Sequence, residues 1–393
     1  MAPRRRILYF ISSLEQGGAE RQLAELIRSL DLGRFEPSLV VCKPVDQLGY
    51  ALPSGPPVSL DAPAGAALLA FGRLRRLLRE RRPDLLHTYL GEANLFGRLA
   101  ARAEGVRCVA SVRCTRLPLG ELLTERLAGR LSERLAGALI VNSAGIRDEL
   151  VARAGLPGGA IDVIENGVDL ARFRPLSPEA REAARARLGL AGTRALVVPG
   201  RLSAQKNQRA ILRALGLLRE RGALPPDVRV LFAGRGSPPW YGALVEAEAR
   251  ARGLLGVVRF PGVVGAIQEL VAAADAVLLP SLYEGLPNAV VEALASGTPA
   301  VVSPPANTDQ LVVDGREGLC LAGTDPRAIA AGLERLFSLP PEALRGLGER
   351  GRRHAVERFA VERMARRTMD VYARVLGDPL VEAPSAAAPA GAP

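Results

Sequence analysis

Short apolar runs alternate with amphipathic segments along most of the chain. The runs have the length of buried strands, and most precede a stretch whose apolar residues recur with helical spacing. The predicted strands are RILYFISS, PSLVVCK, PDLLHTY, RCVASVR, ALIVNS and IDVIENG, and later RALVVPG, VRVLFAG, VVRFPG, DAVLLPS and PAVVSP. Strands that alternate with helices predict an α/β fold, in which helices cover both faces of parallel sheets.

The alternation is interrupted once, at VDLARFRPLSP, which has no clear periodicity. This break predicts two doubly wound, Rossmann-like domains, residues 1–170 and 171–355. We expect a C-terminal helix at about 356–376 to cross back onto the first domain, and the Pro/Ala-rich tail, 377–393, to be disordered. Doubly wound domains bind ligands at the carboxyl ends of their strands, so a site is expected in a cleft between two facing domains.

Lysine is rare in this chain, which makes one of its positions informative. Of the 52 Lys and Arg residues, only Lys43 and Lys206 are lysine. Ser203 is predicted to cap the helix after VVPG, which places Lys206 at its third position. A cation there opposes the helix dipole at a cost of roughly 0.3–1 kcal/mol. Together with Arg201 it favours a bound anion, and an Arg–Lys pair suits a diphosphate. A solvated surface lysine is the alternative.

A second candidate segment is EGLPNAVVEA, residues 284–293. Glu284 follows the predicted strand DAVLLPS, and Pro287 suits the first turn of a helix. Backbone N–H groups of that turn would face the site. Glu292 lies among apolar residues, where a carboxylate needs partners such as vicinal sugar hydroxyls. An exposed stripe of the helix is the alternative for Glu292.

These segments, with GGAER at 17–21 and NGVDLARF at 166–173, resemble the retaining nucleotide-sugar glycosyltransferases of family 4 (glycosyl transferases group 1), which have the GT-B fold. Glu284 and Glu292 reproduce the family's E-x7-E motif. The resemblance implies that Arg201 and Lys206 hold the donor diphosphate and that Glu284 contacts the transferred sugar. It places the base between residues 233–236 and 261–267. The implied catalytic residues are Arg201, Lys206 and Glu284; the implied donor-binding residues are Gly17, Gly18, Gly285, Leu286, Asn288 and Glu292.

His87 closes the predicted strand PDLLHTY. Many relatives have H-x-H here, with the second histidine near the transferred sugar, but this chain has Tyr89 at that position. His87 is therefore interpreted either as a sugar-side residue or as a core residue.

The resemblance implies a retaining transferase of the hexosyl type that moves a sugar from a nucleotide-sugar donor to a glycan or lipid-linked acceptor, in bacterial polysaccharide or glycoconjugate assembly. The chain has no D-x-D sequence, so no metal and no other cofactor are expected. Arg201 and Lys206 would replace the charge of a metal. A GT-B sugar-nucleotide epimerase remains open. A dehydrogenase fits poorly because no G-x-G-x-x-G follows a strand.

The net charge of +11 favours anionic partners. Two arginine groups, Arg75, Arg79 and Arg82 and then Arg126, Arg130 and Arg134, each share a helix face. They predict either peripheral contact with an anionic membrane or ordinary amphipathic helices. A nucleic-acid binder is a weaker alternative, because six Tyr, nine Phe and one Trp offer few stacking groups. Cysteine usage and the absence of a long apolar run predict a cytoplasmic protein.

Overall fold

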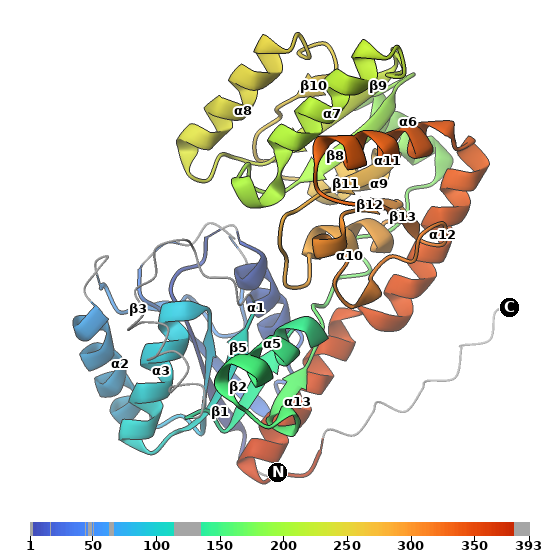
Figure 1. The fold of residues 1–393 in the computed structure, drawn as a ribbon. Helices are drawn as coiled ribbons and strands as arrows, with labels where there is room; N and C mark the ends of the chain where they lie inside the picture. The colour runs from blue at the N-terminus through green and yellow to red at the C-terminus, as the bar shows by residue number, and fades with distance from the viewer. Residues whose placement is uncertain are drawn as a thin grey trace, which may run out of the picture. The chain divides into compact units, whose positions relative to one another are not determined.

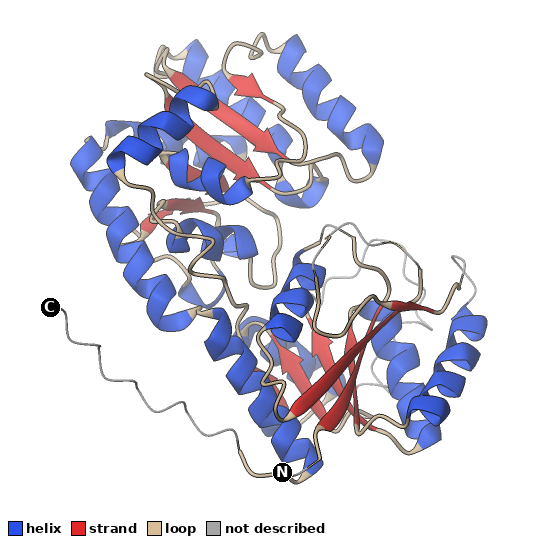
Figure 2. Cartoon of the chain, turned by 180° about the vertical axis from the view of Figure 1, so that it is seen from behind, coloured by secondary structure: helices blue, strands red, loops and turns tan. Residues whose placement is uncertain are grey.

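The computed structural model describes residues 3–15, 17–43, 45, 49, 51–62, 67–113 and 135–380. The chain divides into two compact units. The N-terminal unit comprises Met1–Asn142, Ile146–Ile164 and Glu362–Pro393, and the C-terminal unit comprises Ser143–Gly145 and Glu165–Val361. In each unit, helices cover both faces of a sheet (Figures 1 and 2). The main boundary therefore lies after Ile164, a little before the predicted position at 170, and the return to the N-terminal unit begins at Glu362.

The N-terminal unit contains a parallel sheet with the strand order β3-β2-β1-β4-β5-β6-β7. The described elements that lie wholly or mostly in this unit are β1 (Arg5–Ile11), α1 (Gly18–Arg28), β2 (Phe35–Val41), β3 (Val58–Ser59), α2 (Ala67–Arg81), β4 (Leu85–Tyr89), α3 (Gly91–Glu104), β5 (Arg107–Val112), β6 (Ala138–Val141), α5 (Ala144–Ala154), η1 (Gly158–Ala160), β7 (Ile161–Val163) and α13 (Val361–Leu376).

The C-terminal unit contains a second parallel sheet with the order β10-β9-β8-β11-β12-β13. Its elements are α6 (Pro178–Arg187), β8 (Arg194–Pro199), η2 (Ala204–Lys206), α7 (Gln208–Glu220), β9 (Val228–Ala233), α8 (Pro239–Ala251), β10 (Val258–Arg259), α9 (Ile267–Ala273), β11 (Ala276–Leu279), α10 (Asn288–Ala295), β12 (Ala300–Val302), η3 (Pro304–Ala306), η4 (Thr308–Gln310), β13 (Gly318–Cys320), α11 (Pro326–Ser338) and α12 (Pro341–Arg358).

The central strands are apolar throughout because both faces of each sheet are covered. In β1, every residue of Ile7–Ile11 is at most 1% exposed. Leu8 and Phe10 pack into the core on one face, whereas Tyr9 lies against His87. Continuous apolar runs are the pattern that parallel, doubly covered strands produce. The predicted α/β fold with two doubly wound sheets is confirmed.

The structure adds detail that the hydrophobic pattern did not predict. The strands β3 and β13 are two and three residues long, too short for a periodic signal. The predicted C-terminal helical part is broken at Phe359, whose carbonyl accepts a hydrogen bond from Val168 N–H at 2.8 Å. The expected helix with Arg126, Arg130 and Arg134, and the tail from residue 381, lie outside the described residues.

Helix α13 is fastened to the strands of the N-terminal unit by polar contacts at several points. Arg367 Nη2 donates to the Val163 carbonyl at 2.6 Å, and Arg374 pairs with Asp162. Beyond the helix, Arg5 Nε donates to Asp378 Oδ2 at 2.8 Å. The last helix is thus an integral part of the N-terminal unit.

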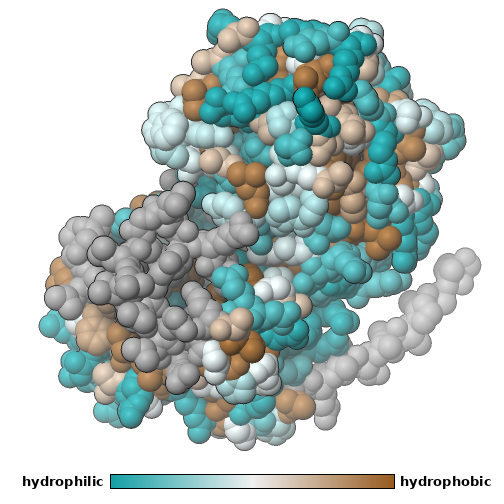
Figure 3. Space-filling view, viewed as in Figure 1, coloured by the Kyte–Doolittle hydropathy of each residue, from teal (hydrophilic) through white to brown (hydrophobic). Residues whose placement is uncertain are grey.

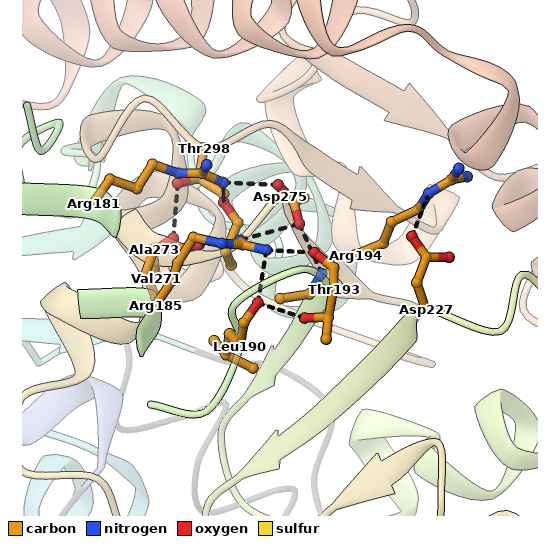
Figure 4. A network of polar contacts seen from close by, with 12 residues as sticks. Arg181, Arg185, Leu190, Thr193, Arg194, Asp227, Val271, Ala273, Asp275 and Thr298 are labelled. Atoms are coloured by element: carbon orange, nitrogen blue, oxygen red, sulfur yellow. Dashed lines mark hydrogen bonds and ion pairs between the residues drawn. The ribbon is translucent and has the colours of Figure 1, made fainter. Parts of the chain in front are cut away.

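A buried-arginine network fastens α6 to the sheet of the C-terminal unit (Figure 4). Asp275 accepts hydrogen bonds from Arg181 at 2.7 Å and from the backbone N–H of Ala195 at 2.7 Å, and pairs with Arg185 at 3.3 Å. Arg185 also donates to the carbonyls of Ala273, Leu190 and Thr193. One carboxylate thereby joins a helix, the start of β8 and the segment before β11.

Replacing Asp275 by alanine should lower the free energy of unfolding of the C-terminal unit by at least about 2 kcal/mol, because hydrogen bonds to charged groups are lost and a backbone N–H is left unpaired. Asp227 provides a matched control in the same view (Figure 4), because its pair with Arg194 is 37% and 47% exposed. Asp227→Ala should cost less than about 1 kcal/mol. Urea unfolding curves measure both, and equal midpoints for the two variants would contradict the prediction.

Candidate functional site

Both sheets reverse their strand order at one point, and the candidate motifs follow the strands on either side of it. In the C-terminal sheet the chain runs from β8 out to β9 and β10 and then returns to β11 on the other side of β8. Ligands of open α/β sheets bind at the carboxyl ends of the strands at such a switch point. Arg201 and Lys206 follow β8, and Glu284 follows β11. The topology therefore brings the two motifs together.

Two glycines allow the loops after β8 and β9 to pack closely. Gly200 has a φ of 127°, a backbone conformation that residues with a side chain rarely adopt. A Cβ on Gly234 would lie 2.0 Å from the Gly200 carbonyl oxygen, so glycine is required there. The loops are joined by hydrogen bonds from Gly200 N–H to the Ala233 carbonyl and from Leu202 N–H to the Arg235 carbonyl, at 2.9 and 2.8 Å.

Lys206 does not lie in the first turn of α7, so its predicted helix position is wrong. It ends the short 3-10 turn η2, and the Ser203 side chain makes no capping hydrogen bond. Asn207 adopts the left-handed conformation (φ 59°) before α7 begins. Its side-chain N–H group donates to the carbonyls of Pro280 and Thr324 at 3.2 and 2.8 Å. These nonlocal bonds hold Asn207 in a conformation that asparagine tolerates well.

The ammonium group of Lys206 and the carboxylate of Glu284 form an ion pair. Lys206 Nζ lies 2.6 Å from Glu284 Oε1, and the two side chains are only 16% and 9% exposed. Gln205 supports the pair, because its side-chain amide donates to the Tyr283 carbonyl at 2.9 Å and to Glu284 Oε2 at 3.4 Å. The loops after β8 and β11 are thereby tied together.

Gln208 closes the loop that contains these groups. Its side-chain amide donates to the Arg201 carbonyl at 2.9 Å and accepts from the Ser203 N–H at 3.2 Å. Sequence reasoning missed Gln205, Asn207 and Gln208. The available signal was three amide side chains near the end of a strand, where they can pair backbone groups of an irregular loop.

Arg201 is exposed, and its guanidinium makes no hydrogen bond or ion pair with the residues that the structure describes. Lys206 is neutralised by Glu284, whereas Arg201 presents an uncompensated positive charge beside the same loop. An anion that binds at this edge of the sheet would therefore meet a guanidinium and a backbone loop.

The segment that contains Gly285, Leu286 and Asn288 forms the approach to α10. Gly285 and Leu286 are buried, and Asn288 is the first residue of the helix. Pro287 lies one residue earlier, at the N-cap, so its predicted place in the first turn is off by one. No side chain caps this helix. The first N–H groups of a helix have no partner within it, so this end can bind an anion or hydroxyl.

Asn166 holds this segment by hydrogen bonds from its side chain, a role that sequence reasoning did not assign. Its side-chain amide donates to the Leu286 carbonyl at 2.9 Å and to Asn288 Oδ1 at 2.6 Å. Glu292, further along α10, is 7% exposed. This burial excludes the exposed-stripe interpretation of Glu292.

The predicted glycine loop of the N-terminal unit follows β1, at the switch point between β1 and β4. Gly17 is the N-cap of α1 and Gly18 its first residue. A Cβ on Gly17 would lie 2.0 Å from Glu20 Oε2, so the Glu20 carboxylate folds back over the loop. A glutamate at this position commonly pairs the N-cap backbone.

His87 is fully buried in the N-terminal unit, between β5 and α13. Its Nδ1 lies 2.6 Å from the Tyr372 hydroxyl and its Nε2 2.9 Å from Ser111 Oγ. The Tyr372 hydroxyl also donates to the Tyr9 hydroxyl at 3.1 Å. Burial lowers the pKa of His87 well below its usual value, and the nearby Arg113 lowers it further. In this structure His87 is a neutral core residue with no surface for a sugar to contact.

Among the described residues, no group of three His, Cys, Asp or Glu side chains is placed to hold a metal ion. On the visible face of the C-terminal unit, hydrophobic side chains are scattered among hydrophilic ones (Figure 3). The described part of the chain contains no helix of the length and apolarity that crossing a membrane requires.

Comparison with known proteins decides the family. Residues 16–172 match Glycosyltransferase Family 4, and residues 193–338 match Glycosyl transferases group 1. The D-inositol 3-phosphate glycosyltransferase of Streptomyces griseus is 31% identical over 326 residues, which cover 75% of this chain and 68% of that protein. The chain belongs to glycosyltransferase family 4. EpsD of Bacillus subtilis (strain 168) is 30% identical over 317 residues, covering 78% of this chain and 80% of EpsD.

Solved structures show that this family 4 glycosyltransferase has the GT-B fold. HepE of Anabaena, in complex with UDP and glucose, superposes with a TM-score of 0.81 at 21% identity over 94% of this chain and 100% of HepE. Sucrose-phosphate synthase of Thermosynechococcus elongatus gives 0.82 at 19% identity, over 95% and 100% of the two chains.

The ion pair at the site should contribute to stability, whereas the neighbouring guanidinium should not. Lys206→Met leaves the Glu284 carboxylate without its cation and should lower the free energy of unfolding by about 3 kcal/mol. Arg201→Met, at an exposed position, should change it by less than about 0.5 kcal/mol. Urea unfolding measures both variants.

The double variant Lys206→Met/Glu284→Gln controls for the lost packing of the lysine. It should be more stable than Lys206→Met alone, because no unpaired charge remains. The coupling would be ruled out if the loss of stability in the double variant equalled the sum of the losses in Lys206→Met and Glu284→Gln.

The buried His87 should make stability depend on pH. Its folded pKa is depressed, so the unfolded chain binds more protons below about pH 6.5. Stability is therefore fully present above that pH and falls on acidification, by up to about 1.4 kcal/mol per pH unit for one histidine. Thermal unfolding between pH 5 and 8, in roughly half-unit steps, measures the slope.

His354 is the matched control. Burial also lowers the pKa of His354, but its side chain is 20% exposed. The slope should be reduced more by His87→Gln than by His354→Gln. A slope that is unchanged in His87→Gln would refute this assignment.

Proposed function

We propose that this protein is a metal-independent retaining glycosyltransferase that moves a hexosyl group from a nucleotide-sugar donor to a glycan or lipid-linked acceptor. The observation that carries the proposal is the placement of the Lys206–Glu284 ion pair, with Arg201 beside it, at the switch point between β8 and β11. The complex of HepE with UDP-glucose supports a uridine nucleotide as the first donor to test.

The proposed chemistry requires the leaving diphosphate to be stabilised as the glycosidic bond breaks. Arg201 would hold phosphate oxygens through two N–H groups, and Lys206 would supply a point charge. Lys206 would move from Glu284 toward the phosphate when the donor binds. That exchange would free the Glu284 carboxylate to accept hydrogen bonds from the hydroxyls of the transferred sugar.

The remaining donor contacts follow from the same elements. The N–H group of Asn288, at the uncapped start of α10, and those of Gly285 and Leu286 in the segment before it would add hydrogen-bond donors. Glu292 would bind the ribose hydroxyls, and Gly17 and Gly18, at the start of α1, would allow close approach of the backbone to a ligand. The departing phosphate would take the proton of the acceptor, so no base such as His87 is needed. Arg201 and Lys206 would then supply the positive charge that a divalent metal supplies in metal-dependent enzymes.

The cellular role that we propose is the assembly of bacterial polysaccharide or glycoconjugate. The protein would act in the cytoplasm, with peripheral contact to the inner face of the membrane where the acceptor is lipid-linked. Cations on the N-terminal unit would provide that contact.

The proposal predicts donor binding and turnover that survive chelation of metals. Thermal unfolding is measured with UDP, GDP and ADP and their hexose forms, in EDTA. One nucleotide family should stabilise the fold. Arg201→Met should leave the fold intact and reduce turnover by about 100-fold or more. Full activity in that variant would exclude the diphosphate role.

Product analysis distinguishes the proposed reaction from its nearest alternative. Anomeric configuration, followed by NMR, should be the same in donor and product. A sugar-nucleotide epimerase would instead convert the donor without any acceptor. Loss of activity in EDTA that Mg²⁺ restores would refute metal independence.

A further inference from the structure

The N-terminal unit has a second concave site, at the opposite edge of its sheet from the switch point. A pocket of about 590 Å³ is lined by residues at the start of β1, β4 and β5, among them Arg5, Asp84 and Arg107. The C-terminal ends of α2 and α3 also contribute lining residues. Its volume is in the range of small-molecule sites, about 300–1,000 Å³. We call it the basal pocket.

The lining of the basal pocket is positively charged. It contains the guanidinium groups of Arg5, Arg79, Arg82 and Arg107 and the carboxylates of Asp84 and Glu104. The carboxylates are already paired: Glu104 with Arg75 at 2.6 Å and Arg79 at 3.6 Å, and Asp84 with Arg5 at 3.8 Å. The acidic groups therefore cannot neutralise the whole lining.

A structural explanation accounts for part of this charge. Cations are favourable near helix C-termini, where backbone carbonyls lack partners. Arg107 fits this explanation, because its Nη1 donates to the Leu376 carbonyl at the end of α13 at 2.6 Å. Arg5 has a different structural role, because its guanidinium pairs with the carboxylate of Asp378, which follows α13.

Arg82 is not explained in this way. It is exposed, and its side chain makes no hydrogen bond or ion pair within the described part of the chain. It also has a φ of 43°, in the left-handed region, directly after α2. This region costs a residue with a side chain roughly 1–2 kcal/mol, and helices commonly end on glycine there. Helix α3 does so at Gly105 (φ 68°), which lines the same pocket.

We propose that the basal pocket binds a phosphate group, and that Arg82 is its principal ligand. A guanidinium can hold two phosphate oxygens at once, and Arg79 lies on the same lining. The phosphate would belong either to a soluble phosphorylated molecule or to a phospholipid headgroup. The site is separate from the proposed donor site, because it is formed within the N-terminal unit at the amino ends of the strands.

A substitution at Arg82 can remove the guanidinium without destabilising the fold. Arg82→Gly removes the guanidinium but relieves the left-handed backbone, so the melting temperature should stay the same or rise. Arg81→Ala is the matched control: it removes an equal charge from the adjacent residue, which does not line the pocket. Diffuse electrostatic attraction would weaken equally in both variants.

Binding of inorganic pyrophosphate is measured by calorimetry on the full chain. All proteins in this assay carry Arg201→Met, so that binding at the proposed donor site contributes less to the signal. Flotation compares vesicles of phosphatidylglycerol and phosphatidylcholine with vesicles of phosphatidylcholine alone. Arg82→Gly should weaken binding of at least one probe by about tenfold or more. Arg81→Ala should leave binding of both probes within about twofold of the background.

The two assays also separate the sources of the phosphate. Dependence of pyrophosphate binding on Arg82, with vesicle binding unchanged, indicates a soluble ligand. Dependence of vesicle binding on Arg82 indicates a lipid headgroup. Equal effects of the two substitutions, no effect of Arg82→Gly, or no binding of either probe overturns the proposal. None of these outcomes depends on whether Arg201 binds the donor.

Discussion

The Lys206–Glu284 ion pair is the interaction on which the candidate site depends. It joins two loops that are 78 residues apart in sequence and that follow neighbouring strands. Both side chains are largely shielded from water, so the charge of each is compensated mainly by the other. In the proposed function, a phosphate would offer Lys206 an alternative partner of the same sign as Glu284.

The backbone of the loops around the pair is held by close packing and by side-chain amides. Gly200 and Gly234 pack backbone against backbone, and the amides of Gln205, Asn207 and Gln208 satisfy carbonyl groups across the loops. Preorganisation of this kind reduces the cost of arranging charges when a ligand binds.

The hydrophobic pattern predicted the sheets well because strands covered on both faces need apolar residues at every position. It could not predict β3, which is defined by pairing with β2 and not by its own composition. It also could not place Lys206, because the conformation of Asn207 depends on the carbonyls of Pro280 and Thr324, far away in sequence. His87 shows the same limit: its partners, Ser111 and Tyr372, lie on β5 and α13.

Six strands in each unit follow the same order, but the two units distribute their positive charge differently. In the C-terminal unit, Arg201 and Lys206 follow a central strand at its carboxyl end, where the helix ends also favour anions. In the N-terminal unit, the described arginines of the basal pocket lie at the amino ends of the strands. The other end of β4 holds a neutral His87 and the aromatic ring of Tyr89. Arg113 lies at this end as well, with its guanidinium 5.3 Å from the centre of the Tyr89 ring, and it helps to lower the pKa of His87.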